Sequence, residues 1–193
     1  KEIEMGVATL RCEYIWPDAA GQLRGKTRVV TIKSEEENWQ LNVSDIPVWS
    51  FDGSSTGQAT TEDSDCVLRP VFACVDSNRA NGVIVLCDVL NTDLTPHETN
   101  TRAKLIDVML QHHATEPFVG FEQEYFLYSG DYPLGWKDGE PGPQGPYYCA
   151  VGEGNVAGRG ISELHLNSCI NSSLSIVGAN AEVALGQWEY QVG

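Results

Sequence analysis

Four glutamates placed inside apolar, strand-forming segments constrain this chain more than any other feature. Glu122 and Glu124 belong to residues 121–128 (FEQEYFLY), which are rich in aromatic side chains and are typical of a β-strand. Side chains alternate between the two faces of a strand, so Glu122 and Glu124 are predicted to share one face. The sequence therefore predicts a strand with concentrated negative charge on one side.

The second pair, Glu182 and Glu189, lies on either side of a predicted two-residue turn at Leu185 and Gly186. Such a turn would place Glu182 directly opposite Glu189 across a hairpin. Like charges that face each other across a ladder are destabilising unless a cation lies between them. Carboxylate oxygens suit a hard ion, so Mg²⁺ or Mn²⁺ is the expected occupant.

Two other interpretations of the glutamates are open from the residues alone. Single glutamates on strands usually lie on the solvated face of a half-exposed sheet. A carboxylate pair also suits a glycosidase, in which one carboxyl is the acid and the other the nucleophile. The solvated face does not explain why like charge gathers among apolar neighbours, and the glycosidase uses only one of the two pairs.

The charge balance excludes some classes of partner. The 193 residues include 27 acidic and 12 basic ones, for a formal net charge of −15. Such a chain repels nucleic acids and anionic membranes and attracts metal ions. Its six cysteines show no C-x-x-C spacing and mostly lie in apolar segments, which indicates reduced, buried thiols in a cytoplasmic protein. The first residues lack the apolar core of a signal peptide, and no segment approaches the length of a membrane span.

The first hundred residues are predicted to be mainly β. Residues 7–16 and 26–32 carry β-forming side chains on either side of turn residues and indicate a hairpin. Residues 67–75 and 82–90 are two further strand segments, and the second is apolar enough for the centre of a sheet. Residues 52–58 (DGSSTGQ) are turn formers, which predicts a loop of the kind that often carries function.

The pattern changes near residue 100, where we place the boundary between two domains, residues 1–100 and 101–193. Asn100 or Thr101 suits the N-cap of a helix whose apolar residues repeat at spacings of three and four.

Beyond the glutamate strand, residues 133–154 are rich in glycine and proline, and a loop of this length is usually functional or disordered. A second amphipathic helix is predicted through Ile161, Leu164, Cys169 and Leu174, with His165 packed against the core.

Four motifs occur in one register along the chain. They are residues 51–58 (FDGSSTGQ), 122–125 (EQEY), 141–149 (PGPQGPYYC) and 180–189 (NAEVALGQWE). Together they resemble successive signatures of glutamine synthetase of the eukaryotic-like type (type II), which also occurs in some bacteria. The resemblance runs from about residue 11 to residue 193 and corresponds to the N-terminal half of that family. Four long motifs in order are far more specific than any one of them.

The resemblance implies an α+β fold, with an N-terminal β-grasp domain followed by the first, incomplete part of the α/β catalytic domain. It implies the reaction of a glutamate–ammonia ligase, in which ATP phosphorylates the γ-carboxylate of glutamate and ammonia displaces the phosphate. By position in the motifs, Glu124, Glu182 and Glu189 would hold one Mg²⁺ or Mn²⁺ ion, and Glu122 would help to hold a second.

The resemblance also implies roles in substrate binding. Glu122 and Glu182 would bind substrate, with Glu182 near the amino group of glutamate. Asp52 would bind ammonium and take its proton, and Tyr148 would lie near ATP. The family forms ring-shaped homo-oligomers, in which the aspartate loop reaches into the site of a neighbouring subunit.

The chain departs from the family pattern mainly in length, because 193 residues are roughly half of what the family has. The family's later segments carry the remaining ligands of the second metal, the arginines that hold ATP and glutamate, and a flap glutamate. Smaller differences are Phe118 in place of a common tryptophan, Gly160 in place of an aspartate, and Ala184 with Leu185 in place of Met-Pro.

Three hypotheses follow. The preferred one is a glutamine synthetase of which this sequence is a part, with little activity as this chain alone. The alternative is a non-catalytic truncated paralogue that assembles with a full-length glutamine synthetase, modulates it and lends Asp52 to a neighbouring site. The third, a metal-dependent hydrolase, rests on the glutamates alone.

Overall fold

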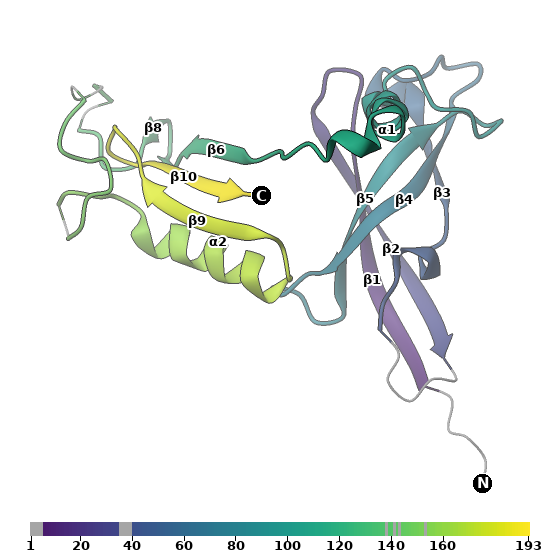
Figure 1. Cartoon of the computed structure of the whole chain (residues 1–193), viewed down its shortest axis with the longest axis horizontal. Helices are drawn as coiled ribbons and strands as arrows, with labels where there is room; N and C mark the ends of the chain where they lie inside the picture. Colours follow the sequence, from purple (N-terminus) through teal and green to yellow (C-terminus); the bar gives the residue numbers. More distant parts are fainter. Residues whose placement is uncertain (1–5, 35–39, 138, 141, 143, 153) are drawn as a thin grey trace, which may run out of the picture. The chain divides into compact units, whose positions relative to one another are not determined.

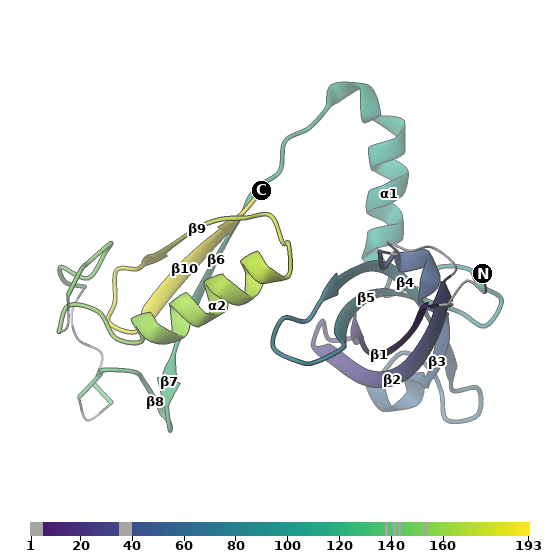
Figure 2. The same cartoon turned by 90° about the horizontal axis from the view of Figure 1, so that it is seen from below.

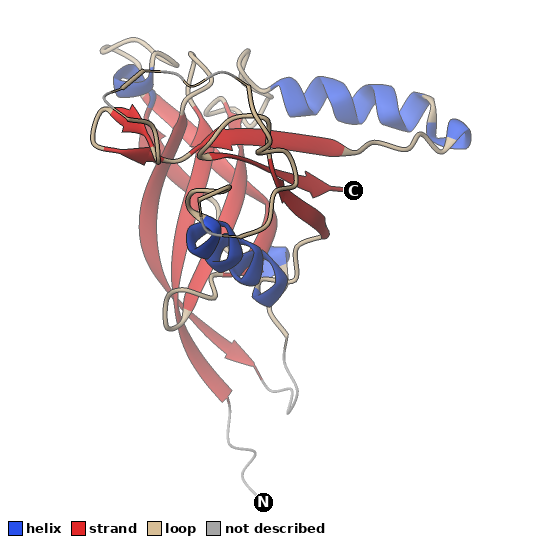
Figure 3. Ribbon diagram, turned by 90° about the vertical axis from the view of Figure 1, so that its left-hand side faces the viewer, coloured by secondary structure: helices blue, strands red, loops and turns tan. Residues whose placement is uncertain are grey.

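The computed structural model of the chain describes residues 6–34, 40–137, 139–140, 142, 144–152 and 154–193. The chain divides into two compact units, Lys1–Glu116 and Pro117–Gly193. Strands predominate over helices (Figure 3). The boundary expected at residue 100 precedes helix α1 (Thr101–Gln111), which this division places with the first unit.

The first unit is built on a sheet that, over the described residues, has five strands. They are β1 (Gly6–Pro17), β2 (Leu23–Ser34), β3 (Trp49–Asp52), β4 (Asp65–Val75) and β5 (Gly82–Leu90). Their order is β2-β1-β5-β4-β3; β1 and β5 are parallel, and the other neighbours are antiparallel. The sheet curls around its core (Figure 2). The predicted hairpin, the two later strands and the central place of β5 are confirmed.

Alternate residues of the central strands form the core of this unit, as the period of two requires. They include Cys12, Tyr14 and Trp16 of β1 and Val83, Val85, Cys87 and Val89 of β5. Leu68 of β4 and Phe51 of β3 pack against them. Burial raises the pKa of the Cys87 thiol to about 12, as expected for an inert buried cysteine. Cys149, in contrast, is exposed, so the expectation of buried thiols does not hold there.

Two cations join β2 to β3 and to the residue that precedes it. Lys26 Nζ donates to Ser50 O (2.8 Å) and lies 3.6 Å from the centre of the Trp49 ring. Arg28 Nη1 donates to Val48 O (3.2 Å). These contacts fix the outer strand β3, which ends at Asp52.

Helix α1 begins as predicted, because the Asn100 side chain accepts a hydrogen bond from Ala103 N (3.1 Å). Among the described residues of the first unit, two short 3-10 turns precede it, Val43–Asp45 and Gly53–Thr56, and a third follows it at His113–Thr115. No helix in the described ranges is long and apolar enough to cross a membrane.

The second unit contains a sheet that has three strands within the described ranges. They are β6 (Phe121–Phe126), β10 (Gln187–Val192) and β9 (Ile176–Ala181), in that order and all antiparallel (Figure 1). The predicted second helix is α2 (Arg159–Asn171), which lies across one face (Figure 2). The His165 ring lies 4.8 Å from the Tyr190 ring, but the side chain of His165 is exposed, so the expected packing of His165 against the core is wrong. Helix α2 also ends before Leu174, which was expected to belong to it. Strands β7 (Tyr128–Ser129) and β8 (Tyr132–Pro133) form a small separate ribbon.

Truncation of Leu68 tests the core of the first unit. Leu68 is fully buried, so Leu68→Ala is expected to lower the free energy of unfolding by about 2–5 kcal/mol, through lost burial and the cavity that remains. Leu23→Ala is the matched control, because Leu23 is 73% exposed and its loss is expected to cost less than about 0.5 kcal/mol. Urea denaturation followed by circular dichroism measures both, and equal losses would contradict the assigned core.

Candidate metal centre

Glu182 and Glu189 do not face each other directly, and the predicted register of their hairpin is wrong by two residues. In the structure Ala181 lies opposite Trp188, so the partner of Glu189 on β9 is Asn180. Glu182 N instead donates to Gln187 O (2.9 Å). Because side chains alternate with a period of two, a shift of two residues keeps Glu182 on the face that Glu189 occupies.

Contacts from outside the hairpin hold this wider turn. Gly186 O accepts a hydrogen bond from Leu127 N (2.9 Å), and Leu185 O accepts one from Trp136 Nε1 (2.7 Å). Gly186 has a φ of 80°, and a Cβ there would lie 2.5 Å from Leu134 O, so only glycine fits without rearrangement. Trp136 is 49 residues from Leu185 in the sequence, and Leu127 is still farther from Gly186, which is why the local pattern predicted a tighter turn.

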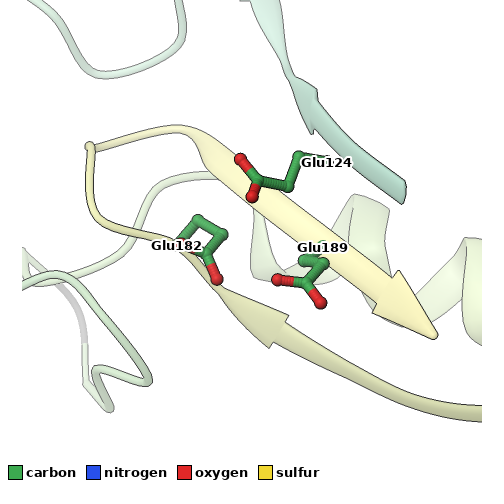
Figure 4. Close-up of side chains that lie close together, drawn as sticks. All are labelled: Glu124, Glu182 and Glu189. Atoms are coloured by element: carbon green, nitrogen blue, oxygen red, sulfur yellow. The ribbon is translucent and has the colours of Figure 1, made fainter. Parts of the chain in front are cut away.

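On the other side of β10, Glu189 lies directly opposite Glu124 of β6. Among the described residues, Glu124, Glu182 and Glu189 form a group in which one carboxylate oxygen of each lies within 4.8 Å of the others. Figure 4 shows the three side chains, which come from β6, from the segment after β9 and from β10. Glu182 and Glu189 are buried and Glu124 is exposed. Glu122 shares their face, opposite Gln191, but lies outside this group.

Side-chain amides orient the three carboxylates. Gln187 Nε2 donates to Glu124 Oε2 (2.7 Å), Asn180 Nδ2 to Glu182 Oε1 (3.0 Å) and Gln191 Nε2 to Glu189 Oε1 (2.6 Å). Gln191 Nε2 also donates to Asn180 Oδ1 (2.7 Å), which joins two of these pairs. These amides were not predicted from the sequence, although the period of two along β10 places Gln187 and Gln191 on the face of Glu189. Amides fix the carboxylates without neutralising them, so the negative charge of the group remains.

The environment separates the pKa values of the two buried carboxyls. Burial raises the pKa of Glu182, and the neighbouring carboxylates of Glu189 and Glu124 raise it further. The hydrogen bond from Gln191 lowers the pKa of Glu189. As the pH falls, Glu182 is therefore the first of the two to take a proton.

The chemistry of this donor set fits a hard divalent cation. All three ligand groups are carboxylates, the oxygen donors that Mg²⁺ and Mn²⁺ prefer. Their mutual repulsion at this separation disfavours the fully charged state unless a cation lies between them. The three residues predicted to hold the first metal are thus brought together.

The Gly/Pro-rich segment passes beside the carboxylates. Cys149 N donates to Ala181 O (2.9 Å), which joins this segment to the end of β9 next to Glu182. Tyr148 is exposed, and a hydrogen bond with the Cys149 side chain raises its pKa, with further effects from the charges of Glu182 and Glu189. Pro141 and Pro143 of this motif lie outside the described residues.

Asp52 lies in the first unit, at the end of β3, with its side chain exposed. Its Oδ1 accepts hydrogen bonds from Ser54 Oγ (2.6 Å) and Ser54 N (2.9 Å), and these lower the pKa of the carboxyl. Asp65 faces it across the ladder of β3 and β4. Asp52 is thus ionised at neutral pH on the rim of a short loop.

Comparison with known proteins shows which proteins the chain is similar to. Residues 10–92, which carry most of the first sheet, match the glutamine synthetase β-grasp domain. Over 190 residues the chain is 48% identical to a glutamine synthetase of Streptomyces viridochromogenes, a match that covers 96% of this chain and 54% of the relative. The chain is a relative of the glutamine synthetases. A glutamine synthetase of Colletotrichum gloeosporioides is 45% identical over 188 residues, which cover 96% of this chain and 51% of the relative. One of Panulirus argus is 42% identical over 197 residues, which cover 99% of this chain and 53% of the relative.

These matches bear on the predictions from sequence. The N-terminal β-grasp domain is confirmed, and relatives in both bacteria and eukaryotes agree with the eukaryotic-like type. The chain spans about half the length of the curated relatives it matches. These relatives are named glutamine synthetases, which are ligases that make glutamine.

Removal of one carboxylate tests the metal centre. Glu189→Ala is expected to weaken Mn²⁺ binding by this chain at least about tenfold, because a buried ligand and the anchor of Gln191 are both lost. Glu182→Ala is expected to do likewise. The matched control is Glu163→Ala, on the exposed surface of α2. Isothermal titration with Mn²⁺ measures the affinities, and unchanged values in both cluster variants would mean that these carboxylates hold no ion.

Acidification tests the raised pKa of Glu182. A metal competes with protons for a carboxylate, so Mn²⁺ affinity is expected to fall as the pH drops through the raised pKa of Glu182, above the about 4.3 of an ordinary glutamate. Glu182→Gln is expected to bind Mn²⁺ more weakly and to lose this part of the pH dependence. Titrations in a pH series measure the effect, and a wild-type affinity that stays constant down to about pH 4 would be the contrary result.

Proposed function

We propose that this chain supplies the metal-binding and ammonium-binding parts of a glutamine synthetase active site. The reaction is the ATP-dependent amidation of glutamate through γ-glutamyl phosphate. The observation that carries the proposal is the convergence of Glu124, Glu182 and Glu189, within a chain related to glutamine synthetases. Activity of this chain alone is expected to be low, because the match covers about half of each relative.

The three carboxylates would hold one Mg²⁺ or Mn²⁺, and Glu122 would contribute to a second ion. Bound divalent cations neutralise the charge of a transferring phosphoryl group and align it for in-line displacement. The amides of Gln187, Asn180 and Gln191 keep the carboxylates in place before an ion arrives. Glu182 and Glu122 would in addition bind the glutamate substrate, with Glu182 near its amino group.

Asp52 would bind ammonium and take its proton. The lowered pKa keeps its carboxylate charged, as attraction of a cation requires. Acidic neighbours add to this field, since the charges of Asp65, Asp63 and Asp52 all act on the buried Cys66 thiol. In a ring-forming homo-oligomer, Asp52 of one subunit would serve the site of the next.

ATP would lie beside the Gly/Pro-rich segment that carries Tyr148. A hollow of about 310 Å³ opens there. It is lined by Trp136, Lys137, Glu140, Gly142, Tyr147, Ala184 and Leu185. Aromatic walls suit a purine ring, and a lysine suits phosphate. Cys149 ties the same segment to the carboxylates through Ala181, which supports a nucleotide close to the metal.

A chimaera tests the proposal. In it, this chain replaces the matching half of the Streptomyces viridochromogenes glutamine synthetase, and glutamate- and ammonium-dependent ADP release is measured with Mg²⁺ or Mn²⁺. We expect turnover, and we expect Glu189→Ala to lower kcat by about a hundredfold or more, through lost charge stabilisation. Glu163→Ala is again the matched control.

The 193-residue chain alone and the same chain mixed with the full-length relative complete the design. An inactive chimaera that folds and assembles would count against the proposed function. Co-purification with the full-length relative, without gain of activity, would instead favour the truncated paralogue.

A further inference from the structure

The loop that carries Asp52 is closed on itself. The 3-10 turn Gly53–Thr56 follows Asp52, and Gln58 N donates back to Gly53 O (2.8 Å). Gly53 N donates to Ser64 O (2.7 Å). A Cβ on Gly53 would lie 2.6 Å from Cys66 Sγ, so the backbone is held against β4 too closely for any other residue. The hydrogen bond from Gln58 N is therefore one of the contacts that close the turn after Asp52.

His97 holds Gln58 through a ring of hydrogen bonds. His97 Nε2 lies 2.6 Å from Gln58 O, and Nδ1 lies 2.9 Å from Thr99 Oγ1. Gln58 Nε2 donates to Thr99 Oγ1 (2.9 Å), which closes the ring. Thr99 N donates to Nδ1 (3.2 Å), so Nδ1 is an acceptor and Nε2 carries the proton that Gln58 O accepts. Each member thus donates to the next, an arrangement in which hydrogen bonds strengthen one another.

The ring is buried and rests on the central strand. His97 is 7% exposed and Gln58 5%. His97 N donates to Val89 O of β5 (3.1 Å), and Asn100 N donates to His97 O (2.9 Å). Gln58 Oε1 is buried without a hydrogen-bond partner in the part of the chain that the structure describes, because the amide is turned to give its donors to the ring and to Pro17 O. The contact spans 39 residues, so it joins the loop to the rigid part of the sheet.

We propose that His97 is a positioning residue for Asp52: it fixes Gln58 and thereby keeps the Asp52 carboxylate in the orientation that ammonium needs. This rests on the proposed role of Asp52. His97 itself touches no reacting group. Its contribution is to hold the Ser54 donors on Asp52 Oδ1, which orient that carboxylate. The sequence motif of the loop ends at Gln58 and gives no indication of this partner.

The first experiment is independent of activity. In the 193-residue chain, ¹³C NMR follows the titration of the Asp52 carboxyl, and amide exchange follows Gln58 N. His97→Phe is expected to raise the pKa of Asp52 toward its ordinary value, as the Ser54 donors are lost, and to speed exchange at Gln58 about tenfold. His97→Gln, whose amide can replace Nε2, is expected to restore both. His112→Gln, at the exposed end of α1, is the matched control.

Thr99→Val breaks the ring of hydrogen bonds at nearly constant side-chain volume and leaves His97 in place. This variant therefore still tests the proposal if His97→Phe fails to fold. We expect it to change the pKa of Asp52 in the same direction. An unchanged Asp52 pKa and unchanged exchange at Gln58 in either folded variant would overturn the proposal.

The second experiment uses the chimaera. His97→Phe is expected to lower kcat/KM for ammonium at least about tenfold, because a misplacement of about 1 Å can cost roughly a hundredfold in rate. The KM values for ATP and glutamate are expected to stay unchanged. Equal losses for all three substrates would indicate a merely structural role and overturn the proposal. An inactive wild-type chimaera would count against the proposed function, while the NMR titration would still decide whether His97 holds the loop.

Discussion

Repulsion among three carboxylates within 4.8 Å is the constraint on which the second unit depends. Glu182 and Glu189 are buried, so water screens this repulsion poorly. Burial raises the pKa of Glu182, and the neighbouring carboxylates raise it further. Hydrogen bonds from Gln187, Asn180 and Gln191 hold the charges together but leave them charged. Carboxylates that repel one another in this way gain stability from a divalent cation, which is the basis of the proposed role in phosphoryl transfer.

The first unit has a different task in the proposed function, which is to present one exposed carboxylate at a fixed place. Asp52 lies at the end of β3, where Lys26 and Arg28 hold the backbone, and the loop after it is closed through Gln58. The buried ring with His97 and Thr99 then connects this loop to the central strand. The β-grasp sheet is in this sense a rigid support for a small acidic loop.

The alternation of side chains made much of the fold predictable from sequence. It placed β1, β2, β4 and β5, and it put Glu122 and Glu124 on one face of β6. The N-cap at Asn100 was predictable because capping depends on neighbouring residues alone. The register of the hairpin between β9 and β10 was not predictable, because the turn is held by Leu127 and Trp136, which are distant from it in the sequence. The error shifted the pairing by two residues, so the face of Glu182 was still correct.

The sequence by itself determined which residue types could form the site and which face each strand gives them, because periodicity and motif order are local properties. Only the tertiary structure decided which carboxylates meet. It set Glu124 opposite Glu189, left Glu122 outside their group and supplied the amides that orient them. It also joined His97 to Gln58 across 39 residues. The physical reason is that strand order and long-range hydrogen bonds depend on how the whole chain packs, and no local pattern encodes that packing.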